Sequence, residues 1–190
     1  MFTQMSGAFA ASGPALDPTL ELHYNFNSST ISGTTIADQS GHGRDGTLVN
    51  SPTSVSSPSG QALSFLASSS QYITTPYYCS ALDPITIFIR MRVPASYAIY
   101  SAAFGCAVAV DTGFILVQRA TDGSAQFTDG YFDRPVNYPA GTLVTDTWTR
   151  LAQTVNGTTA TGYAGGVSVS DYTPFYHTDS GKALVLAAMY

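Results

Sequence analysis

The sequence predicts an all-β sandwich, and three observations support this prediction. Turn signals recur at short spacing, at Asp111-Thr112-Gly113, Asp122-Gly123, Asp129-Gly130 and Asn156-Gly157. Apolar and polar residues alternate between such signals, and no segment has a convincing helical period. The chain has 190 residues, enough to bury a core as one domain, and no internal repeat is visible. Together these features are typical of an antiparallel all-β sandwich.

The first expected elements are an arm and a strand. Residues 1–20 are rich in Ala, Ser and Gly and show no periodicity, so we expect an N-terminal arm before a single domain over residues 21–190. From Leu22 to Phe26, apolar residues alternate with polar ones, which is the period of a half-buried strand. A Ser- and Pro-rich loop follows at residues 51–60.

The longest expected strand runs from Ile85 to Arg92. One face of it carries Ile85, Ile87, Ile89 and Met91, and the other carries Thr86, Phe88, Arg90 and Arg92. Further along, Asn156-Gly157 lies between two strand-like runs. Asn-Gly predicts a hairpin with a type I′ turn, because that turn needs φ > 0 at both central residues.

The loop Asp38-Gln39-Ser40-Gly41-His42-Gly43-Arg44-Asp45-Gly46 combines three glycines with two carboxylates. Glycines so close together indicate a sharply folded backbone. Asp38 and Asp45 then have two alternative roles. They could ligate Ca²⁺ together with backbone carbonyls, or they could cap the turns of their own loop and bind nothing.

Several motifs occur in an order found in one known family. The glycine loop is followed by Ala62-Leu63-Ser64-Phe65, by Gln71–Pro76, by Thr147–Ala152 and by Gly162–Gly166. From about Leu22 to its end the chain resembles the laminin-G-like, concanavalin-A-like jelly-roll family. The resemblance implies an antiparallel two-sheet jelly-roll sandwich with Trp148 in the core. Residues 183–190 are similar to the strand before the family's closing strand, so that last strand is expected to be missing.

Composition limits the function classes. Charged residues make up 10% of the chain, the formal net charge is −5, and Glu21 is the only glutamate. Lys and Arg form no cluster along the sequence, which argues against nucleic acid as a partner. The most apolar stretch, Tyr97–Val110, is too short to span a bilayer, so no membrane insertion is expected. The first ten residues lack the basic and apolar regions of a signal peptide.

Cys79 and Cys106 are the only two cysteines. A single pair leaves two alternatives open, partly buried free thiols or a disulfide, and the free thiols are the favoured expectation.

The sequence argues against an enzyme. The sandwich glucanases of related fold need two carboxylates on one face of a strand, and no Glu-x-Asp-x-Glu pattern exists here. Asp129 and Asp133 lie in a turn-rich segment, and the histidines are scattered. We therefore expect no catalytic residues.

Aromatic loops are the better candidates for recognition. Tyr and Phe beside Asp and Arg can stack on sugar rings and bind hydroxyls, and they also suit protein interfaces. The alternative is that these aromatics fold back on the core. The predicted ligand-binding residues are Tyr131, Asp133, Arg134, Tyr138, Tyr172 and Tyr176.

Two function classes follow. The favoured one is a structural or adhesive module on a virion surface, such as a phage capsid decoration or fibre component. In that role its partners would be copies of itself or other virion proteins, and an arm would cover the edge of the first strand. The alternative is a free extracellular carbohydrate-binding module with cell-surface glycans as partners.

Overall fold

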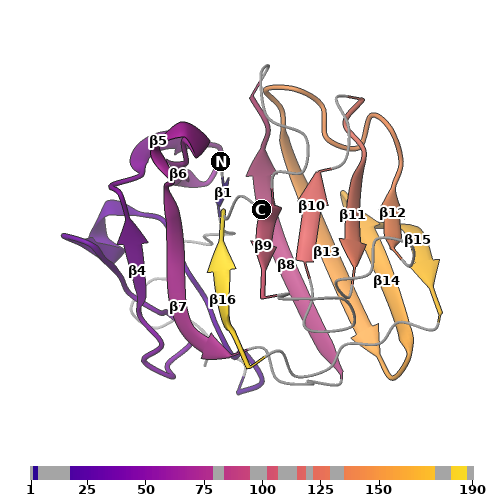
Figure 1. The fold of residues 1–190 in the computed structure, drawn as a ribbon, viewed down its shortest axis with the longest axis horizontal. Helices are drawn as coiled ribbons and strands as arrows, with labels where there is room; N and C mark the ends of the chain where they lie inside the picture. The colour runs from indigo at the N-terminus through magenta and orange to yellow at the C-terminus, as the bar shows by residue number, and fades with distance from the viewer. Residues whose placement is uncertain are drawn as a thin grey trace.

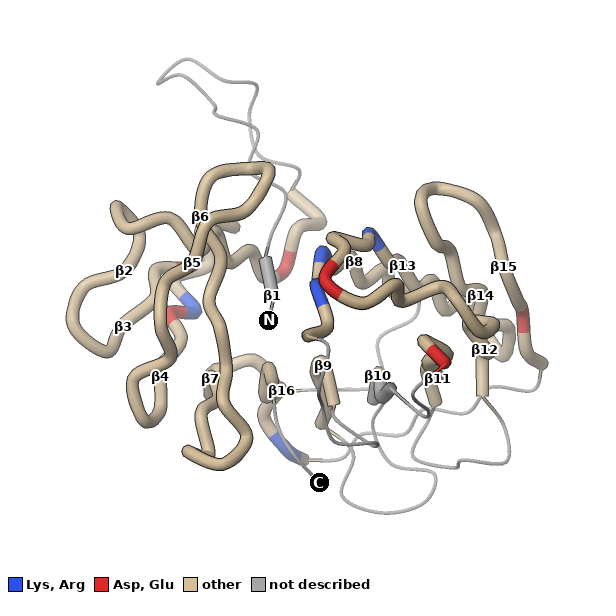
Figure 2. The backbone as a smooth tube through the Cα atoms, turned by 90° about the horizontal axis from the view of Figure 1, so that it is seen from above, with Lys and Arg blue, Asp and Glu red and all other residues tan. Residues whose placement is uncertain are grey.

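A computed structural model describes residues 2–3, 18–78, 84–94, 102–106, 115–118, 122–128, 135–173 and 181–187. Within these residues the chain forms two antiparallel sheets that lie face to face as two layers (Figures 1 and 2). The predicted all-β sandwich is therefore confirmed. None of the described residues belongs to a helix long and apolar enough to cross a membrane.

The first layer is a seven-stranded sheet with the order β15-β14-β13-β8-β1-β6-β5. Its strands are β1 (Phe2–Thr3), β5 (Thr53–Ser57), β6 (Gly60–Ser64), β8 (Ile85–Arg92), β13 (Trp148–Asn156), β14 (Thr159–Ala164) and β15 (Val167–Tyr172). The longest expected strand is thus confirmed as β8. It pairs along its whole length with β13.

The second layer is a nine-stranded sheet with the order β12-β11-β10-β9-β16-β7-β4-β3-β2. Its strands are β2 (Ile31–Ser32), β3 (Thr35–Ile36), β4 (Gly46–Val49), β7 (Tyr72–Tyr78), β9 (Ala102–Gly105), β10 (Ile115–Gln118), β11 (Ala125–Thr128), β12 (Val136–Tyr138) and β16 (Ala183–Leu186). Two short 3-10 turns, Ser28–Thr30 and Ala67–Ser69, connect strands.

The core lies between the sheets and follows from the period of two in each strand. The largest buried side chains come from both layers: Ile36, Leu63, Ile73, Phe104, Leu116, Phe127 and Leu151. Burial of each such side chain contributes about 1.5–3 kcal/mol. The sheets are also joined by hydrogen bonds, because the Tyr138 hydroxyl on β12 donates to the Ala152 carbonyl of β13 (2.8 Å) and accepts from Gln153 Nε2 (2.6 Å).

The predicted first strand, Leu22–Phe26, is not part of either sheet. Tyr24 and Phe26 are buried as the alternation predicts, but only one bridge, from Tyr24 to Asp38, joins the segment to another. The Asp38 carboxylate accepts the His23 amide (3.0 Å), so a loop side chain replaces the expected ladder bonds. The prediction of an edge strand here is wrong for that reason.

Residues Phe2–Thr3, which fall in the predicted arm, form β1 between β6 and β8. Phe2 pairs with Leu63 on one side and with Met91 on the other. Residues 4–17 lie outside the described residues. The division into an arm and a domain at residue 20 remains a prediction.

The predicted hairpin between β13 and β14 is present, with a different turn. Asn156 pairs with Thr159, so the central residues are Gly157 and Thr158. Gly157 has φ 60, and Thr158 is not among the residues with positive φ. This pattern is that of a type II′ turn, which needs φ > 0 at its first central residue alone.

The structure corrects two further expectations. Cys106 is buried and disulfide-bonded, so it is not a free thiol; Cys79, the other cysteine of the sequence, lies outside the described residues. Trp148 is half-buried and does not belong to the core cluster, because Leu151 and Val155 of the same strand occupy the inward face. Trp148 therefore lies on the outer face of the seven-stranded sheet.

Candidate functional site

The outer face of β8, β13 and β14 concentrates aromatic and cationic side chains. In β8 and β13 the inward residues Ile89, Met91 and Leu151 are buried, so their neighbours in sequence point outward. Cross-strand pairing then brings Trp148 opposite Arg92 and Arg150 opposite Arg90. We call this surface the aromatic–arginine face and define it by Phe88, Arg90, Arg92, Trp148, Arg150 and Tyr163.

A row of paired positions crosses this face and holds two aromatic residues. Phe88 pairs with Ala152, and Ala152 pairs with Tyr163. Phe88 is 46% exposed and Tyr163 is partly exposed. The two aromatic positions therefore lie on either side of the small residue Ala152 on the central strand. Flat apolar rings beside a small residue can accept the CH face of a sugar ring.

The next rows hold the cations. The guanidinium carbons of Arg90 and Arg92 lie 5.9 and 5.8 Å from the centre of the Trp148 ring, within the range of a cation–π contact. Arg90 Nη1 donates to the Ser59 hydroxyl. Arg90 is 8% exposed, and its Nε is buried without a hydrogen-bond partner. Burial lowers the pKa of Arg90, and the positive charge of Arg150 lowers it further.

Carboxylates do not neutralise these arginines within the described residues. The one ion pair there joins Arg44 to Glu21, far along the sequence from the face. Asp146 lies in the turn before β13, where its amide donates to the Val93 carbonyl (2.8 Å), but it forms no ion pair with a described arginine. Figure 2 marks the cationic positions along the backbone of β8 and β13 in this layer.

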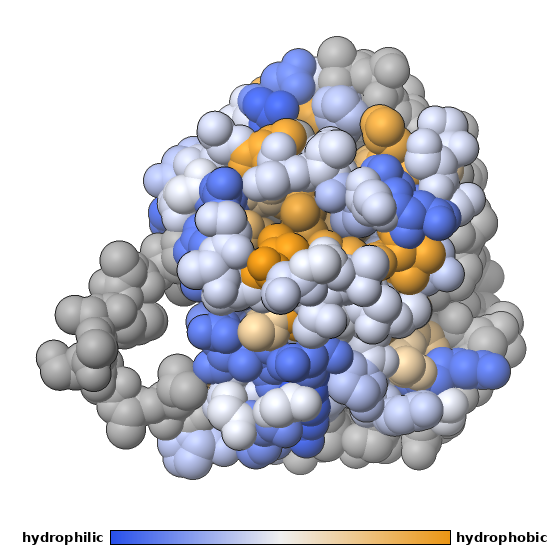
Figure 3. All heavy atoms as spheres, turned by 90° about the vertical axis from the view of Figure 1, so that its left-hand side faces the viewer, coloured by the Kyte–Doolittle hydropathy of each residue, from blue (hydrophilic) through white to orange (hydrophobic). Residues whose placement is uncertain are grey.

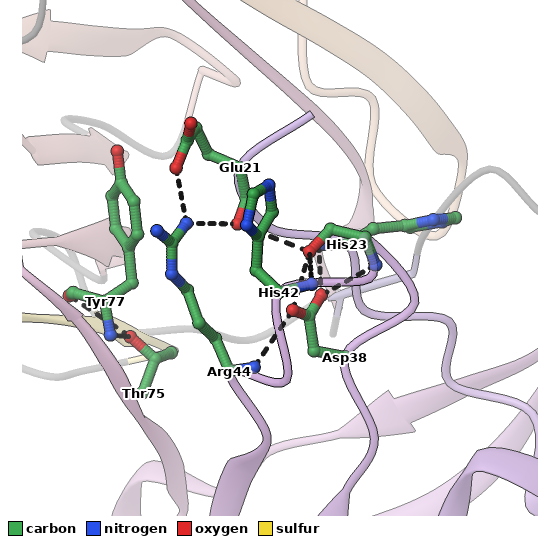
Figure 4. A network of polar contacts seen from close by, with 8 residues as sticks. Glu21, His23, Asp38, His42, Arg44, Thr75 and Tyr77 are labelled. Carbon is green, nitrogen blue, oxygen red and sulfur yellow. Dashed lines mark hydrogen bonds and ion pairs between the residues drawn. The ribbon is translucent and has the colours of Figure 1, made fainter. Parts of the chain in front are cut away.

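The glycine loop forms a second polar cluster, drawn in Figure 4. Asp38 Oδ1 accepts the amides of His23 (3.0 Å) and Ser40 (2.9 Å), and Oδ2 accepts the Ser40 hydroxyl (2.6 Å) and the Arg44 amide (3.1 Å). Asp45 Oδ1 accepts the Asp38 amide (2.9 Å). Apart from the His23 amide, the donors to both carboxylates belong to their own loop, as the turn-capping alternative predicts.

The charge state of Asp38 follows from these contacts. Burial alone would raise the pKa of its carboxyl. The hydrogen bonds from Ser40, His23 and Arg44 outweigh burial and hold the pKa below its usual value. Burial also lowers the pKa of His23, against the opposing charge of Asp38. Neither ring nitrogen of His23 has a hydrogen-bond partner.

Arg44 links the loop to its neighbours. Its Nη1 donates to the Glu21 carbonyl (2.6 Å) and to the Glu21 carboxylate, and its guanidinium carbon lies 5.1 Å from the centre of the Tyr77 ring (Figure 4). Its carbonyl accepts the Tyr24 hydroxyl (2.6 Å). Arg44 thus has an acidic and an aromatic partner and serves the fold of the loop.

Calcium at Asp38 and Asp45 remains a prediction. An ion at Asp38 would have to replace donors that already occupy both of its oxygens. Across the described ranges, no group of three or more His, Cys, Asp or Glu residues could hold a metal ion. The loop's fold depends on glycine, since Gly41 and Gly43 have φ of 94° and 66°.

A groove of about 260 Å³ lies at the other end of the sandwich, between the edge strands β2 and β5. Ile31, Leu48 and Leu63 contribute its apolar lining, and Ser, Thr and Gln side chains contribute polar groups. Figure 3 shows that end of the molecule, where apolar surface is surrounded by polar residues. Neither an aromatic nor a charged residue lines the groove, so it offers a sugar no stacking surface.

The structure excludes one of the predicted ligand-binding residues, Tyr138, whereas Tyr172 is partly exposed and stays a prediction. Tyr138 is 1% exposed and its hydroxyl bonds within the core, so it cannot contact a ligand. Tyr172 pairs with the inward-facing Ala160 and packs against the core. Tyr131, Asp133, Arg134 and Tyr176 lie outside the described residues and stay predictions.

Solved structures similar to this chain include the two that follow. One is Domain 4 of AbnA, an extracellular arabinanase from Geobacillus stearothermophilus, in complex with arabinotriose, with a TM-score of 0.62 and 18% identity over 81% of this chain and 78% of that one. The other is the binding domain of Paraclostridial Mosquitocidal Protein 1, with a TM-score of 0.64 and 14% identity over 85% of this chain and 43% of that one. No family model and no curated protein matches the sequence. These likenesses show the fold alone, an antiparallel β-sandwich.

The sequence showed half of the aromatic–arginine face. Alternation in Ile85–Arg92 placed Phe88, Arg90 and Arg92 together on one side of a strand. The sequence analysis missed Trp148, Arg150 and Tyr163. The alternation within one strand does not reveal which strand pairs with it or in which register. The alternation of Trp148 and Arg150 around Thr149 was the available signal.

Proposed function

We propose that this domain is a non-catalytic carbohydrate-binding module whose sugar site is the aromatic–arginine face. The observation that carries the proposal is the row Phe88–Ala152–Tyr163, in which two partly exposed rings flank a small residue beside three arginines. Aromatic rings supply stacking area, and guanidinium groups supply several fixed donors for hydroxyl oxygens.

The fold supports this proposal. One of the two structures reported above is a domain in complex with arabinotriose, and the other is a binding domain. We also propose that the domain is laminin-G-like, because its sequence motifs occur in the order found in that family. The domain would then act outside cells, as a module that attaches to glycans.

The absence of catalysis is part of the proposal. Hydrolysis of a glycosidic bond needs two carboxyl groups on either side of the bond. Among the described strand positions of the outer face there is one carboxylate, Asp171, which pairs with Thr161 at the β15 side. We therefore expect binding without turnover.

The virion-surface role, favoured on sequence alone, has no observation here in its support. The comparisons favour the carbohydrate-binding alternative over it.

A glycan array tests the proposal. The wild-type domain should bind a subset of glycans, and Phe88→Ala should weaken that binding about fivefold, because a stacking contact is worth about 1 kcal/mol. Tyr78→Ala is the matched control, since Tyr78 is 60% exposed and lies on β7 of the other sheet. Equal binding by the wild type and Phe88→Ala would reject this site.

The same array distinguishes a sugar site in the predicted aromatic loops from one on the aromatic–arginine face. If Tyr131→Ala or Tyr176→Ala abolishes binding while Phe88→Ala does not, the sugar site is in the predicted aromatic loops. Binding to no glycan would reject the carbohydrate-binding function itself.

A further inference from the structure

The arginines of the aromatic–arginine face are arranged at an energetic cost. Arg90 and Arg150 are directly opposite each other on β8 and β13, and Arg92 is the next outward residue on β8. Like charges at directly opposed positions of a sheet are destabilising. Trp148 offsets part of this cost by its cation–π contacts but carries no negative charge.

A negative charge is missing from this cluster. Arg90 is 8% exposed and its Nε lacks a partner, which is unfavourable for a charged group unless a hydrogen-bond acceptor is supplied. Within the described part of the chain, the ion pair of Arg44 with Glu21 is the one that forms, so Arg90, Arg92 and Arg150 have no carboxylate partner. An anionic ligand can reach Arg150, which is exposed, and Arg92, which is partly exposed, whereas the Nε of Arg90 is buried.

The row Phe88–Ala152–Tyr163 indicates that the ligand also has an apolar surface. Phe88 lies on the same face as Arg90, one outward position before it on β8, and Tyr163 lies in the row of Phe88 on β14. A ligand that uses both features needs an apolar ring face and an anionic group close to it. A uronic acid has both, because its carboxylate is attached directly to the sugar ring. Guanidinium groups bind carboxylates in a bidentate manner that an ammonium group cannot reproduce.

We infer that the aromatic–arginine face selects acidic polysaccharides, with Phe88 and Tyr163 contacting the ring of a uronate residue and Arg150 and Arg92 binding its carboxylate. This inference rests on the proposed function. The inference adds that the glycan is anionic and names the residues that bind its carboxylate.

The charge of the whole chain favours a glycan over a nucleic acid. The formal net charge is −5, so a densely charged phosphate chain is repelled by the rest of the molecule. Nucleic-acid binding also needs many phosphate contacts along a basic surface. Three arginines on one face suit a single carboxylate per sugar.

Titration calorimetry with two matched probes tests the inference. Polygalacturonate carries the carboxylates, and its fully methyl-esterified form has the same rings without the charges. The wild type should bind the acid at least about tenfold more tightly than the ester, because a charge-assisted bidentate pair is worth at least about 1.5 kcal/mol.

Variants then test whether Arg150 and Arg92 cause the preference for the acid over the ester. Arg150→Gln and Arg92→Gln should bring the affinity for the acid down to that for the ester, and Arg150→Lys should recover it in part. Lys182→Gln is the matched control, because it removes one positive charge from an exposed residue next to β16 in the other sheet. Circular dichroism checks that each variant is folded. Arg150 is exposed, so its replacement should leave the core intact.

Each outcome has one meaning. Equal binding of acid and ester, with loss of both on Phe88→Ala, would overturn the inference and keep the proposed function. Arginine variants that behave like Lys182→Gln would also overturn it. Tighter binding of a sulfated glycan or of a single-stranded DNA oligomer than of polygalacturonate would replace it with general polyanion binding. Affinity for polygalacturonate that Phe88→Ala and Arg150→Gln leave unchanged would place the acid site elsewhere and overturn it.

Discussion

Asp38 joins its own loop to the segment Leu22–Phe26 through one side chain. Its two oxygens accept four hydrogen bonds, from the amide of His23, the amide and hydroxyl of Ser40, and the amide of Arg44. Packing does not hold every part of this loop in place. Beyond Gly43, for example, nothing lies within 4 Å of where a Cβ would be.

We predict that Asp38→Asn destabilises the domain by about 2 kcal/mol, because an amide cannot accept at both ends and hydrogen bonds to a charged group are worth about 1.5–3 kcal/mol. Thermal unfolding of both proteins, in calcium and in EDTA, measures this cost. The turn-capping role predicts the same cost in both buffers. A cost that appears in calcium and disappears in EDTA would establish Asp38 as a calcium ligand instead.

We predict that stability falls as the pH drops below about 6.5, and that His23 contributes to the fall. Burial lowers the pKa of His23 in the folded state, so the unfolded chain binds the proton first. Urea unfolding at pH 7.5 and pH 5.5 measures the difference. His23→Leu should have a smaller difference than the wild type, and an unchanged difference would remove His23 from the account.

Asp38 gives a separate effect at lower pH. Its folded pKa is below the usual value, so its contribution is complete above the unfolded pKa and is lost as the pH falls through the folded one. Asp38→Asn should therefore flatten the acid limb of the stability curve below about pH 4.

At the scale of elements, close approach of the two sheets depends on β14. Gly162 faces inward, and a Cβ there would lie 2.7 Å from Val136 Cγ1 and 3.0 Å from the Tyr138 hydroxyl oxygen. Val136 and Tyr138 belong to β12 of the other layer. A side chain at position 162 would push the layers apart.

We predict that Gly162→Ala lowers the free energy of unfolding by about 1–3 kcal/mol, as overpacking of a filled core does. Thr161→Ala is the control, since Thr161 lies on the outer face of the same strand. Urea denaturation compares the two. Equal stability of the two variants would mean that β12 can move away without cost.

The positions of strands with one buried face could be predicted from the sequence. The pairing between strands could not. The alternation in Ile85–Arg92 gave the bounds and both faces of β8 correctly. The same alternation in Leu22–Phe26 gave the buried side chains but a wrong strand, because the Asp38 side chain takes the place of a neighbouring strand. A period of two reports burial, and it does not report the source of the backbone's hydrogen bonds.

Less of the candidate site than of the fold could be predicted, because the site also depends on how strands pair. Tyr138 and Tyr172 come next to turn signals, which suggested exposed loops, yet both lie on strands, where Tyr138 is buried and Tyr172 packs partly against the core. The aromatic–arginine face is assembled by register between β8, β13 and β14, and register depends on tertiary packing.

At the scale of the whole molecule, charge is unevenly placed. The chain has a net charge of −5, yet Arg90, Arg92 and Arg150 gather on one face of one sheet. We predict that binding of polygalacturonate weakens between about 0.05 and 0.5 M salt, because added ions screen exposed charges. Binding of the methyl ester should not change in the same titration. Equal salt dependence of the two probes would contradict an electrostatic role for the arginines.

The central claim is that the domain binds sugar on the aromatic–arginine face, and NMR mapping tests it most directly. A ¹⁵N-labelled sample is titrated with trigalacturonate, and backbone amide shifts are followed. We predict that the largest changes fall on β8, β13 and β14 near Phe88, Arg150 and Tyr163. Changes confined to the groove between β2 and β5, or to the segments around Tyr131 and Tyr176, would contradict the claim.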